Sequence, residues 1–323
     1  MGRMRILPIF SAIPSTLQPY HSKYFHFFLA HHKYDCIFVV YYHINTLKQY
    51  AMLTVKSLSY YYKTNKNILW NINTTLKPGS IYGLLGLNGE GKTTLLKLIV
   101  GMLIPKDGSI EFKGHFSSER IAEYFNEVYF LPDYSKLPDL GIEQFGKLYG
   151  GFYSKYDHQQ YLDCIKEFNI PISNRLRALS LGQHRKVHLS FALACNSSVL
   201  LMDEPTNGLD IPSKAVFRKL LSKFIDEDRI FLIATHQIRD VDVLFDHLMI
   251  MKSGSLVLDE NIYQLSKKLK VSKSTADAEQ ALYVQEELSG SYYLVHNHSE
   301  SESKLDIEFL FNAFTNNPKP IEL

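Results

Sequence analysis

The chain has 323 residues, of which 46% are hydrophobic and 21% are charged, and its formal net charge at pH 7 is +2. This length and composition are typical of a globular protein with a large core and more than one subdomain. The small net charge argues against a polyelectrolyte nucleic-acid site. The scattered cysteines Cys36, Cys164 and Cys195 lack the spacing of a metal site or a disulfide framework, which fits a reducing compartment. No apolar run reaches the roughly 18 residues of a membrane span, so we expect that this chain does not itself cross a membrane.

The first 51 residues differ from the rest of the chain. They hold five of the 13 histidines and five basic residues against the single acid Asp35. A targeting peptide is disfavoured because no long apolar stretch precedes a small-residue cleavage site, and a metal-binding tract because the histidines are irregularly spaced. We expect residues 1–51 to lie outside the fold, either as a disordered segment or because the true translation start is Met52.

A strand, a glycine-rich loop and a helix follow one another after Met52. Residues 53–62 and 68–76 alternate apolar and polar side chains, as half-buried strands do. Residues 81–86 form a nearly continuous apolar run, which is typical of a buried parallel strand. That run leads directly into the glycine-rich residues 86–94, and residues 95–102 continue with the apolar period of a helix. This setting predicts a phosphate-binding loop.

The residue types of the loop fit that chemistry. Gly86, Gly89 and Gly91 permit backbone conformations that turn successive N–H groups toward phosphate oxygens, and the helix presents its positive N-terminal end to the same anion. Lys92 supplies a charge to the β- and γ-phosphates, and the Thr93 hydroxyl can ligate Mg²⁺. A glycine-rich turn with an incidental lysine is the alternative, and the flanking strand and helix disfavour it.

Two further apolar strands end in residues that suit hydrolysis. Residues 199–203 end in Asp203, with Glu204 next, at the sheet edge where open α/β proteins bind ligands. Asp203 can hold Mg²⁺ directly or through water, and Glu204 is placed to orient and polarise an attacking water. Residues 229–236 end in His236, for which we favour a γ-phosphate contact over a purely structural role.

Residues 179–183, with the sequence LSLGQ, contain no acid, base or metal ligand. We expect Ser180 to cap a helix that continues to about Ala194 and carries Val187 and Phe191 on one face. The N-terminus of such a helix binds anions through its free N–H groups, and Gly182 allows a close approach.

With GLNGEGKTT, LSLGQ, LLMDEPTNGLD and ATH in this order, the chain resembles the nucleotide-binding subunits of ATP-binding-cassette (ABC) transporters. The similarity covers residues 52–264, which the resemblance identifies as the ATP-binding domain. It implies an α/β fold: a P-loop NTPase core of the RecA-like type, with an antiparallel β subdomain and an inserted α-helical subdomain at about 134–196. Residues 265–323 would be a linker and a small C-terminal extension. We expect two strands and a short amphipathic helix there, which cap the core or support a dimer rather than regulate it.

The resemblance implies ATP and Mg²⁺ as cofactors and assigns roles to individual residues. Glu204 matches the catalytic glutamate and His236 the switch histidine, and residues 208–210, which end in Asp210, match the D-loop that crosses the dimer interface. Thr93 and Asp203 match the magnesium ligands. The ATP-binding residues would be Tyr62, Gly86, Leu87, Asn88, Gly89, Glu90, Gly91, Lys92, Thr93 and Thr94. The signature residues, which would contact ATP held by the opposite subunit, are Leu179, Ser180, Leu181, Gly182 and Gln183. Tyr62 is the candidate for stacking on adenine, with Tyr61 as its rival.

Two residues depart from the family pattern. Asp133 stands where the family has a glutamine at the end of a strand, so it is either a magnesium ligand with a shorter, charged arm or a turn residue beside Pro132. Leu181 stands where the signature has a glycine. Between these positions, aromatic residues of the helical subdomain either line a groove for a membrane-spanning partner or form the subdomain core. These residues are Tyr134, Phe145, Tyr149, Phe152 and Tyr153.

The resemblance therefore implies an ATP-hydrolysing subunit at the cytoplasmic face of the membrane. It would act as a homodimer or heterodimer and power a separate membrane-spanning subunit of exporter type, with no nucleic acid as partner. An ABC ATPase that acts on DNA is disfavoured because no long coiled coil separates Lys92 from Ser180. A ribosomal translation factor is disfavoured because the chain carries one cassette, and a P-loop kinase because such a kinase has no LSLGQ.

Overall fold

The computed structural model describes residues 51–63, 68–134, 136–288, 290–299, 302–317, 321 and 323, all within the unit Gln49–Leu323. The expected N-terminal extension, residues 1–51, lies outside the described residues apart from Ala51. Within the described ranges, no helix is both long enough and apolar enough to span a bilayer.

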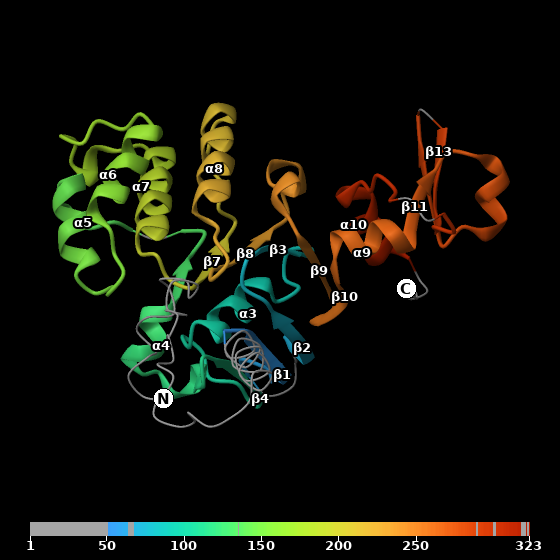
Figure 1. Cartoon of the computed structure of the whole chain (residues 1–323), viewed down its shortest axis with the longest axis horizontal. Helices are drawn as coiled ribbons and strands as arrows, with labels where there is room; N and C mark the ends of the chain where they lie inside the picture. The colour runs from blue at the N-terminus through green and yellow to red at the C-terminus, as the bar shows by residue number, and fades with distance from the viewer. Residues whose placement is uncertain are drawn as a thin grey trace, which may run out of the picture. The chain divides into compact units, whose positions relative to one another are not determined.

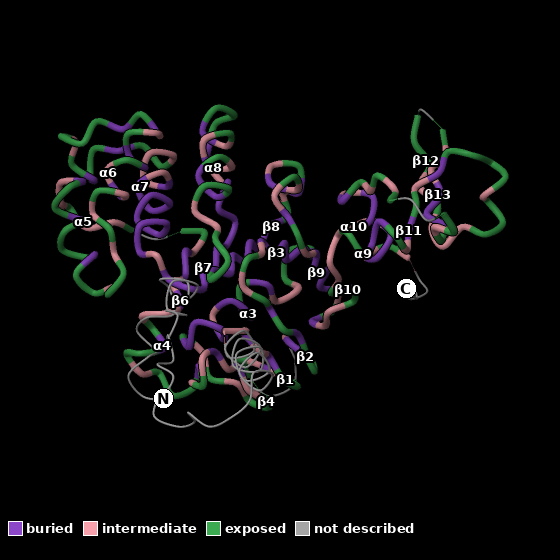
Figure 2. Tube along the Cα trace, viewed as in Figure 1, coloured by how far each residue is buried: buried purple, intermediate pink, exposed green. Residues whose placement is uncertain are grey.

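A mixed six-stranded sheet forms the centre of this unit (Figure 1). Its strand order is β10-β9-β3-β8-β7-β6, and all neighbours pair in parallel except β9 and β10. The strands are β3 (Ser80–Leu85), β6 (Val128–Leu131), β7 (Val199–Asp203), β8 (Ile230–Thr235), β9 (His247–Lys252) and β10 (Ser255–Asn261). β7 and β8 are buried along their whole length, as the tube in Figure 2 shows. This burial explains their continuous apolar sequences, because helices cover both faces of such a sheet.

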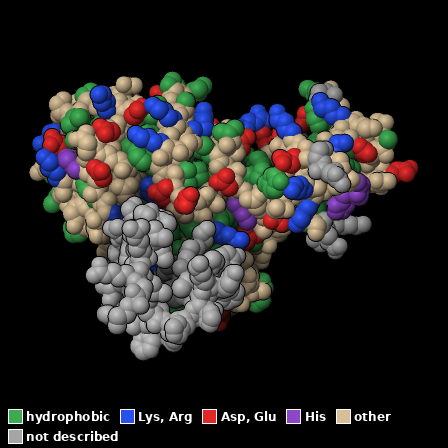
Figure 3. Space-filling view, in the orientation of Figure 1, with side chains coloured by type: hydrophobic (Ala, Val, Ile, Leu, Met, Phe, Trp, Pro, Cys, Tyr) green, Lys and Arg blue, Asp and Glu red, His purple; other side chains and the backbone are tan. Residues whose placement is uncertain are grey.

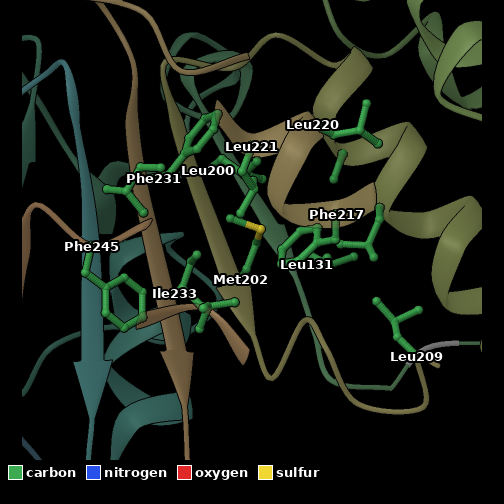
Figure 4. Close-up of a cluster of buried hydrophobic side chains, with 14 of the residues drawn as sticks. Leu131, Leu200, Met202, Leu209, Phe217, Leu220, Leu221, Phe231, Ile233 and Phe245 are labelled. Carbon is green, nitrogen blue, oxygen red and sulfur yellow. The ribbon is translucent and has the colours of Figure 1, made fainter. Parts of the chain in front are cut away.

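The two faces of the central sheet belong to two hydrophobic clusters. Along β7, Leu200 and Met202 point to one face and Val199 and Leu201 to the other, as the period of two in a strand requires. On the first face the strands pack against α8 (Ile211–Phe224), whose Phe217, Leu220 and Leu221 lie over Leu200, Met202, Phe231 and Ile233 in Figure 4. On the second face they pack against α3 (Lys92–Ile99) and a smaller sheet.

The smaller sheet is antiparallel and has the order β2-β1-β4-β5. Its strands are β1 (Leu53–Tyr60), β2 (Leu69–Leu76), β4 (Asp107–Phe112) and β5 (His115–Phe116). It joins the central sheet where the Trp70 N–H donates to the Gly254 carbonyl, 2.9 Å away, at the β9–β10 turn. That turn lies at Ser253–Gly254, with both residues at positive φ.

Three helices group together beside α8, at the left of Figure 1. They are α5 (Ile142–Gly150), α6 (His158–Glu167) and α7 (Leu181–Ala194). Phe191 lies at their centre, with its ring centroid 5.0 Å from that of Phe145 and 6.0 Å from that of Tyr153. Phe145 therefore belongs to the core of this group, whereas Phe152 is 73% exposed and Tyr134 is also on the surface. The core alternative thus holds for Phe145, and a partner groove at the exposed Phe152 and Tyr134 stays a prediction.

Further helices and helical turns lie between or after these elements. The α-helices are α4 (Ala122–Glu127), α9 (Ile262–Lys268) and α10 (Ile307–Asn316). The 3-10 turns are η3 (Ser117–Glu119), η4 (Leu176–Ala178), η5 (Ile238–Asp240), η6 (Asp242–Leu244) and η7 (Thr275–Gln280).

The C-terminal extension has three strands where the sequence predicts two. They are β11 (Leu269–Ser272), β12 (Tyr283–Glu287) and β13 (Gly290–His296), in the order β11-β13-β12. β11 falls in a stretch whose many lysines suggest a linker, yet Leu269 is fully buried and pairs with His296. Pairing with a distant strand, which local composition does not report, decides the conformation here. The predicted helix is present as α10, and its Asn317 cap accepts a hydrogen bond from Lys252 Nζ, 3.2 Å away.

A charged cluster at Glu127 ties three parts of the unit together. The Glu127 carboxylate at the end of α4 accepts hydrogen bonds from Lys113 Nζ (2.8 Å), from Lys155 Nζ (2.9 Å) and from the Ser198 hydroxyl. Lys113 follows β4, Lys155 lies between α5 and α6, and Ser198 precedes β7. Burial alone would raise the pKa of Glu127, but these donors hold it at about 2.

We predict that Glu127→Gln lowers the free energy of unfolding at pH 7 by about 2 kcal/mol, because two lysines lose a partly buried counterion. The depressed pKa makes this contribution complete above the ordinary carboxyl pKa of 4.5, and it fades as the pH falls toward 2. Urea unfolding at pH 7 and at pH 3 should therefore give a smaller difference between wild type and variant at pH 3. Glu143→Gln, which breaks an exposed helical pair with Lys147, is the control and should lower the free energy of unfolding much less than Glu127→Gln does. A difference that is independent of pH would contradict this account.

Candidate nucleotide-binding and catalytic site

The site lies at one edge of the central sheet, where three parallel strands end together. β8 pairs in register with both neighbours, so that Thr235 lies opposite Leu85 of β3 and Ala234 opposite Asp203 of β7. The loop after β3, the residues after β7 and the residues after β8 therefore leave the sheet at the same edge. Parallel open sheets bind their ligands at this edge.

The loop of residues 86–94 has the backbone that its glycines allow. Gly89 and Gly91 have φ of +89° and +102°, in the left-handed region that favours glycine. A side chain at Gly91 would also meet Leu69 Cδ2 at 2.7 Å and the Ile68 carbonyl oxygen at 3.0 Å. The helix α3 begins directly after Gly91 without a side-chain cap, so the loop delivers its free N–H groups to the sheet edge.

Lys92 is held under this loop. Its Nζ donates to the Gly86 carbonyl at 2.6 Å and to the Leu87 carbonyl at 3.2 Å. Burial lowers the pKa of Lys92, and the nearby charges of Glu204 and Asp203 partly oppose that shift. The positive charge is therefore fixed at the centre of an anion-binding loop.

Thr93 and Asp203 meet across the site, with the Thr93 hydroxyl donating to Asp203 Oδ2 at 2.7 Å. Burial raises the pKa of Asp203, the bond from Thr93 lowers it, and the charges of Glu204 and Asp133 raise it further. A cation beside Asp203 would relieve both the burial and the repulsion. The described residues contain no group of three or more His, Cys, Asp or Glu side chains arranged for a metal. A hydroxyl and one carboxylate nevertheless suit Mg²⁺, which takes few protein ligands and completes its shell with water and phosphate oxygens.

Glu204 and His236 form the second half of the site. Glu204 is buried, with φ of +46°, and its carboxylate accepts from the Thr235 hydroxyl at 2.9 Å and from the His236 N–H at 3.0 Å. His236 Nδ1 lies 2.6 Å from Glu204 Oε1. The sequence places these two residues at neighbouring strand ends, and the structure brings them into direct contact.

Asp133 belongs to a chain of side chains beside the site. Its Oδ1 accepts from Asn207 Nδ2 at 2.9 Å, and Asn207 Oδ1 in turn accepts from Gln237 Nε2 at 2.8 Å. The sequence analysis missed Asn207 and Gln237, although each stands within three positions of a predicted site residue. A magnesium role for Asp133 stays a prediction. The charge of Asp133 raises the pKa of Asp203, and a cation between the two carboxylates would relieve that repulsion.

The signature residues begin α7. Ser180 Oγ accepts from the Gln183 N–H at 3.3 Å, and Gln183 Oε1 accepts from the Ser180 N–H at 2.9 Å, so the two form a capping box. Leu181 is 67% exposed. A side chain at Gly182 would meet the Gly208 carbonyl oxygen at 2.7 Å, so this glycine packs directly against the predicted D-loop. That loop ends at Asp210, which caps α8 through the Ser213 N–H.

Tyr62, rather than Tyr61, lies beside the phosphate-binding loop. Its hydroxyl is 3.2 Å from Thr94 Oγ1, and its ring meets that of Tyr60 edge-on at 5.1 Å. Tyr61 instead has Lys106 Nζ over its ring, 5.4 Å from the centroid. The position of Tyr62 supports its predicted adenine-stacking role, which stays a prediction.

The fold and the loop define a P-loop nucleotide-binding protein. The family model described as "ABC transporter" matches residues 69–207. The ABC transporter ATP-binding protein NatA of Bacillus subtilis is 28% identical over 64% of this chain and 88% of that protein. A putative ABC transporter ATP-binding protein of Saccharolobus solfataricus is 32% identical over 65% of this chain, which spans only 40% of that relative's length.

Solved structures agree on the fold. The ATP-binding subunit of an ABC transporter has a TM-score of 0.62 at 23% identity and covers 66% of this chain and 91% of its own. The dimeric ATP-binding cassette MJ0796, bound to ADP and Pi, has a TM-score of 0.59 at 22% identity and covers 65% of this chain and 98% of its own. The predicted P-loop fold class is thereby confirmed. Residues 69–207 thus match the ABC transporter family model, and the chain carries an ABC-type ATPase domain.

We predict opposite effects for two neighbouring signature substitutions. Gly182→Ala should lower ATPase activity about tenfold or more, because the new methyl group would meet the Gly208 backbone and displace the start of α7. Leu181→Gly should preserve or increase activity, because it restores the residue of the family pattern at an exposed position. Steady-state hydrolysis by the two purified variants checks both expectations. Equal losses of ATPase activity in the two variants would contradict the special role that we assign to the packing of Gly182 against Gly208.

Proposed function

We propose that this protein is the ATP-binding and ATP-hydrolysing subunit of an ABC transporter of exporter type. It would work at the cytoplasmic face of the membrane and power a separate membrane-spanning partner. The observation that carries the proposal is the sheet edge at which the Thr93–Asp203 pair and the Glu204–His236 pair meet the phosphate-binding loop. A magnesium site, a general base and an anion cradle within one edge suit hydrolysis of a nucleoside triphosphate.

In the proposed mechanism, the loop N–H groups and Lys92 bind the β- and γ-phosphates. Thr93 and Asp203 hold Mg²⁺, which would neutralise the charge that develops on the phosphoryl oxygens. Glu204 accepts a hydrogen bond from the attacking water and polarises it, while His236 keeps the Glu204 carboxylate oriented and reaches the γ-phosphate. Tyr62 stacks on the adenine ring of ATP.

A dimer of cassettes would complete the site. Each motif that faces the second cassette in the family carries an exposed apolar residue: Leu87 in the phosphate loop, Leu181 in the signature and Ile211 after Asp210. Apolar side chains at these points gain burial when two cassettes close on ATP. Closure on binding and opening after hydrolysis would drive the membrane partner between states.

The surface supports a protein partner rather than a nucleic acid. On the face in Figure 3, the described Lys and Arg side chains are interspersed with Asp and Glu side chains and form no continuous basic stripe. Leu148 and Phe152 on the helical subdomain are exposed and apolar, which suits a docking site for the membrane subunit. The proposed export direction draws on a Nod factor export relative and on the likeness of the C-terminal extension to those of some exporter-type subunits. An arabinose import relative matches at the same 27% identity, so a direction-resolved flux assay tests that part.

We predict that Glu204→Gln leaves ATP binding intact, lowers hydrolysis about a hundredfold or more and traps a dimer with ATP. Lys92→Ala should instead weaken ATP binding itself. Equilibrium ATP binding, steady-state hydrolysis and sedimentation in the presence of ATP separate the two variants. Normal turnover by Glu204→Gln would overturn the catalytic assignment.

Co-purification from membranes tests the transporter role. We expect the native protein to copurify with a multi-span membrane protein after mild detergent extraction. Recovery of the protein on ribosomes or DNA, without a membrane partner, would contradict the transporter assignment. The ATPase domain would then be the only feature shared with ABC transporters.

A further inference from the structure

Arg185 lies inside the molecule on the first turns of α7, two residues after the signature. Its side chain is buried, with 5% of the residue exposed. All its described hydrogen bonds go to main-chain carbonyl oxygens. The acceptors are Pro132 (2.5 Å), Asp133 (3.0 Å), Asp203 (2.8 Å), Glu204 (2.6 Å) and Pro205 (3.1 Å). One guanidinium therefore spans the residues that follow both β6 and β7.

Several of these carbonyls belong to the peptides that orient the side chains of Asp203 and Glu204. Glu204 has φ of +46°, a left-handed conformation that side-chain-bearing residues rarely adopt and that persists only where the surroundings impose it. On one side the Glu204 N–H donates to the Ala234 carbonyl at 2.8 Å, and on the other side Arg185 holds the Glu204 carbonyl. The strained peptide is thus fixed at both ends, and its carboxylate points at Thr235 and His236.

The shape and charge of arginine suit this position. A guanidinium presents five N–H donors in a rigid plane, whereas an ammonium has three donors on a single atom and an amide has two. Burial lowers the pKa of Arg185 to about 10, and the charges of Asp133, Asp203 and Glu204 oppose that shift, so the group is charged at pH 7. It also offsets the negative charge gathered at this edge.

We propose that Arg185 is a positioning residue for ATP hydrolysis: it holds the strained Glu204 peptide so that the carboxylate keeps its catalytic orientation. Because Arg185 and the signature share α7, a shift of the signature helix displaces the guanidinium and releases Glu204 in the same chain. The signature would therefore act on two sites. It would contact the ATP of the opposite cassette, and it would position the general base Glu204 of its own chain. This inference rests on the proposed catalytic role of Glu204.

Arg229 provides a matched control. It is equally buried, at 5% exposed, burial lowers its pKa to the same value of about 10, and it binds the carbonyls of Ser197 and Phe224. Ser197 precedes β7 and Phe224 ends α8 ahead of β8, so neither acceptor belongs to the residues after β6 and β7 that Arg185 holds. Loss of Arg229 removes a similarly buried charge and two bonds to main-chain carbonyls without touching Glu204.

The test compares Arg185→Lys and Arg185→Gln with Arg229→Lys in the full chain. We measure the dissociation constant for ATP, the kcat at saturating Mg–ATP and the melting temperature. Both Arg185 variants should lower kcat roughly tenfold to a hundredfold with the ATP dissociation constant changed by less than about threefold. Arg229→Lys should lower the melting temperature by a similar amount and leave kcat within about twofold of wild type.

Each other outcome contradicts the inference. A kcat loss for the Arg185 variants no larger than for Arg229→Lys would show a purely structural role. Loss of ATP binding by both Arg185 variants would also overturn it, because the proposal assigns Arg185 to the chemical step. Glu204→Gln, assayed in parallel, separates the two claims. If it hydrolyses ATP normally, the proposed function fails. If it is inactive while both Arg185 variants retain wild-type kcat, only the role of Arg185 fails.

Discussion

The structure depends on the parallel pairing of β8 with β3 on one side and with β7 on the other. This pairing brings residues from three distant segments to one edge, within hydrogen-bond distance of each other. Thr93 reaches Asp203 across 110 residues of sequence, and His236 reaches Glu204 across 32. The buried apolar lengths of β7 and β8 stabilise the edge, since α8 covers one face and α3 the other. The chemistry of the site is a consequence of this packing.

The edge concentrates charge that neighbouring groups must balance. Asp203, Glu204 and Asp133 are close enough for their charges to raise the pKa of Asp203 beyond the effect of burial. Lys92 and Arg185 supply the opposite charge from two directions, one beneath the phosphate loop and one from the signature helix. A bound Mg²⁺ and the phosphates would alter this balance together, which gives a physical reason for the site to change shape when ATP binds.

The sequence reveals those parts of the site that reside in local patterns. The loop of residues 86–94, the strand that ends at Asp203 and the serine cap of α7 all follow from residue type and spacing. Arg185 escaped because the sequence does not show which distant carbonyls a buried helix residue meets, and Asn207 because its partners Asp133 and Gln237 lie far from it in the chain. The same limit explains β11, because its partners in β13 lie 21 to 27 residues further along the chain, beyond any local signal. Gly182 was assigned to an approach to phosphate, and the structure adds a contact with Gly208 inside the same chain.

The most direct test of the account is an experimental structure of the Glu204→Gln variant with Mg–ATP. We predict that the triphosphate lies on the loop before α3, with Mg²⁺ between Thr93 and Asp203 and the γ-phosphate beside His236. We also predict that Ser180 of a second cassette contacts the same γ-phosphate. A triphosphate bound away from the N-terminus of α3, or a γ-phosphate contacted by Ser180 of its own chain, would contradict the account.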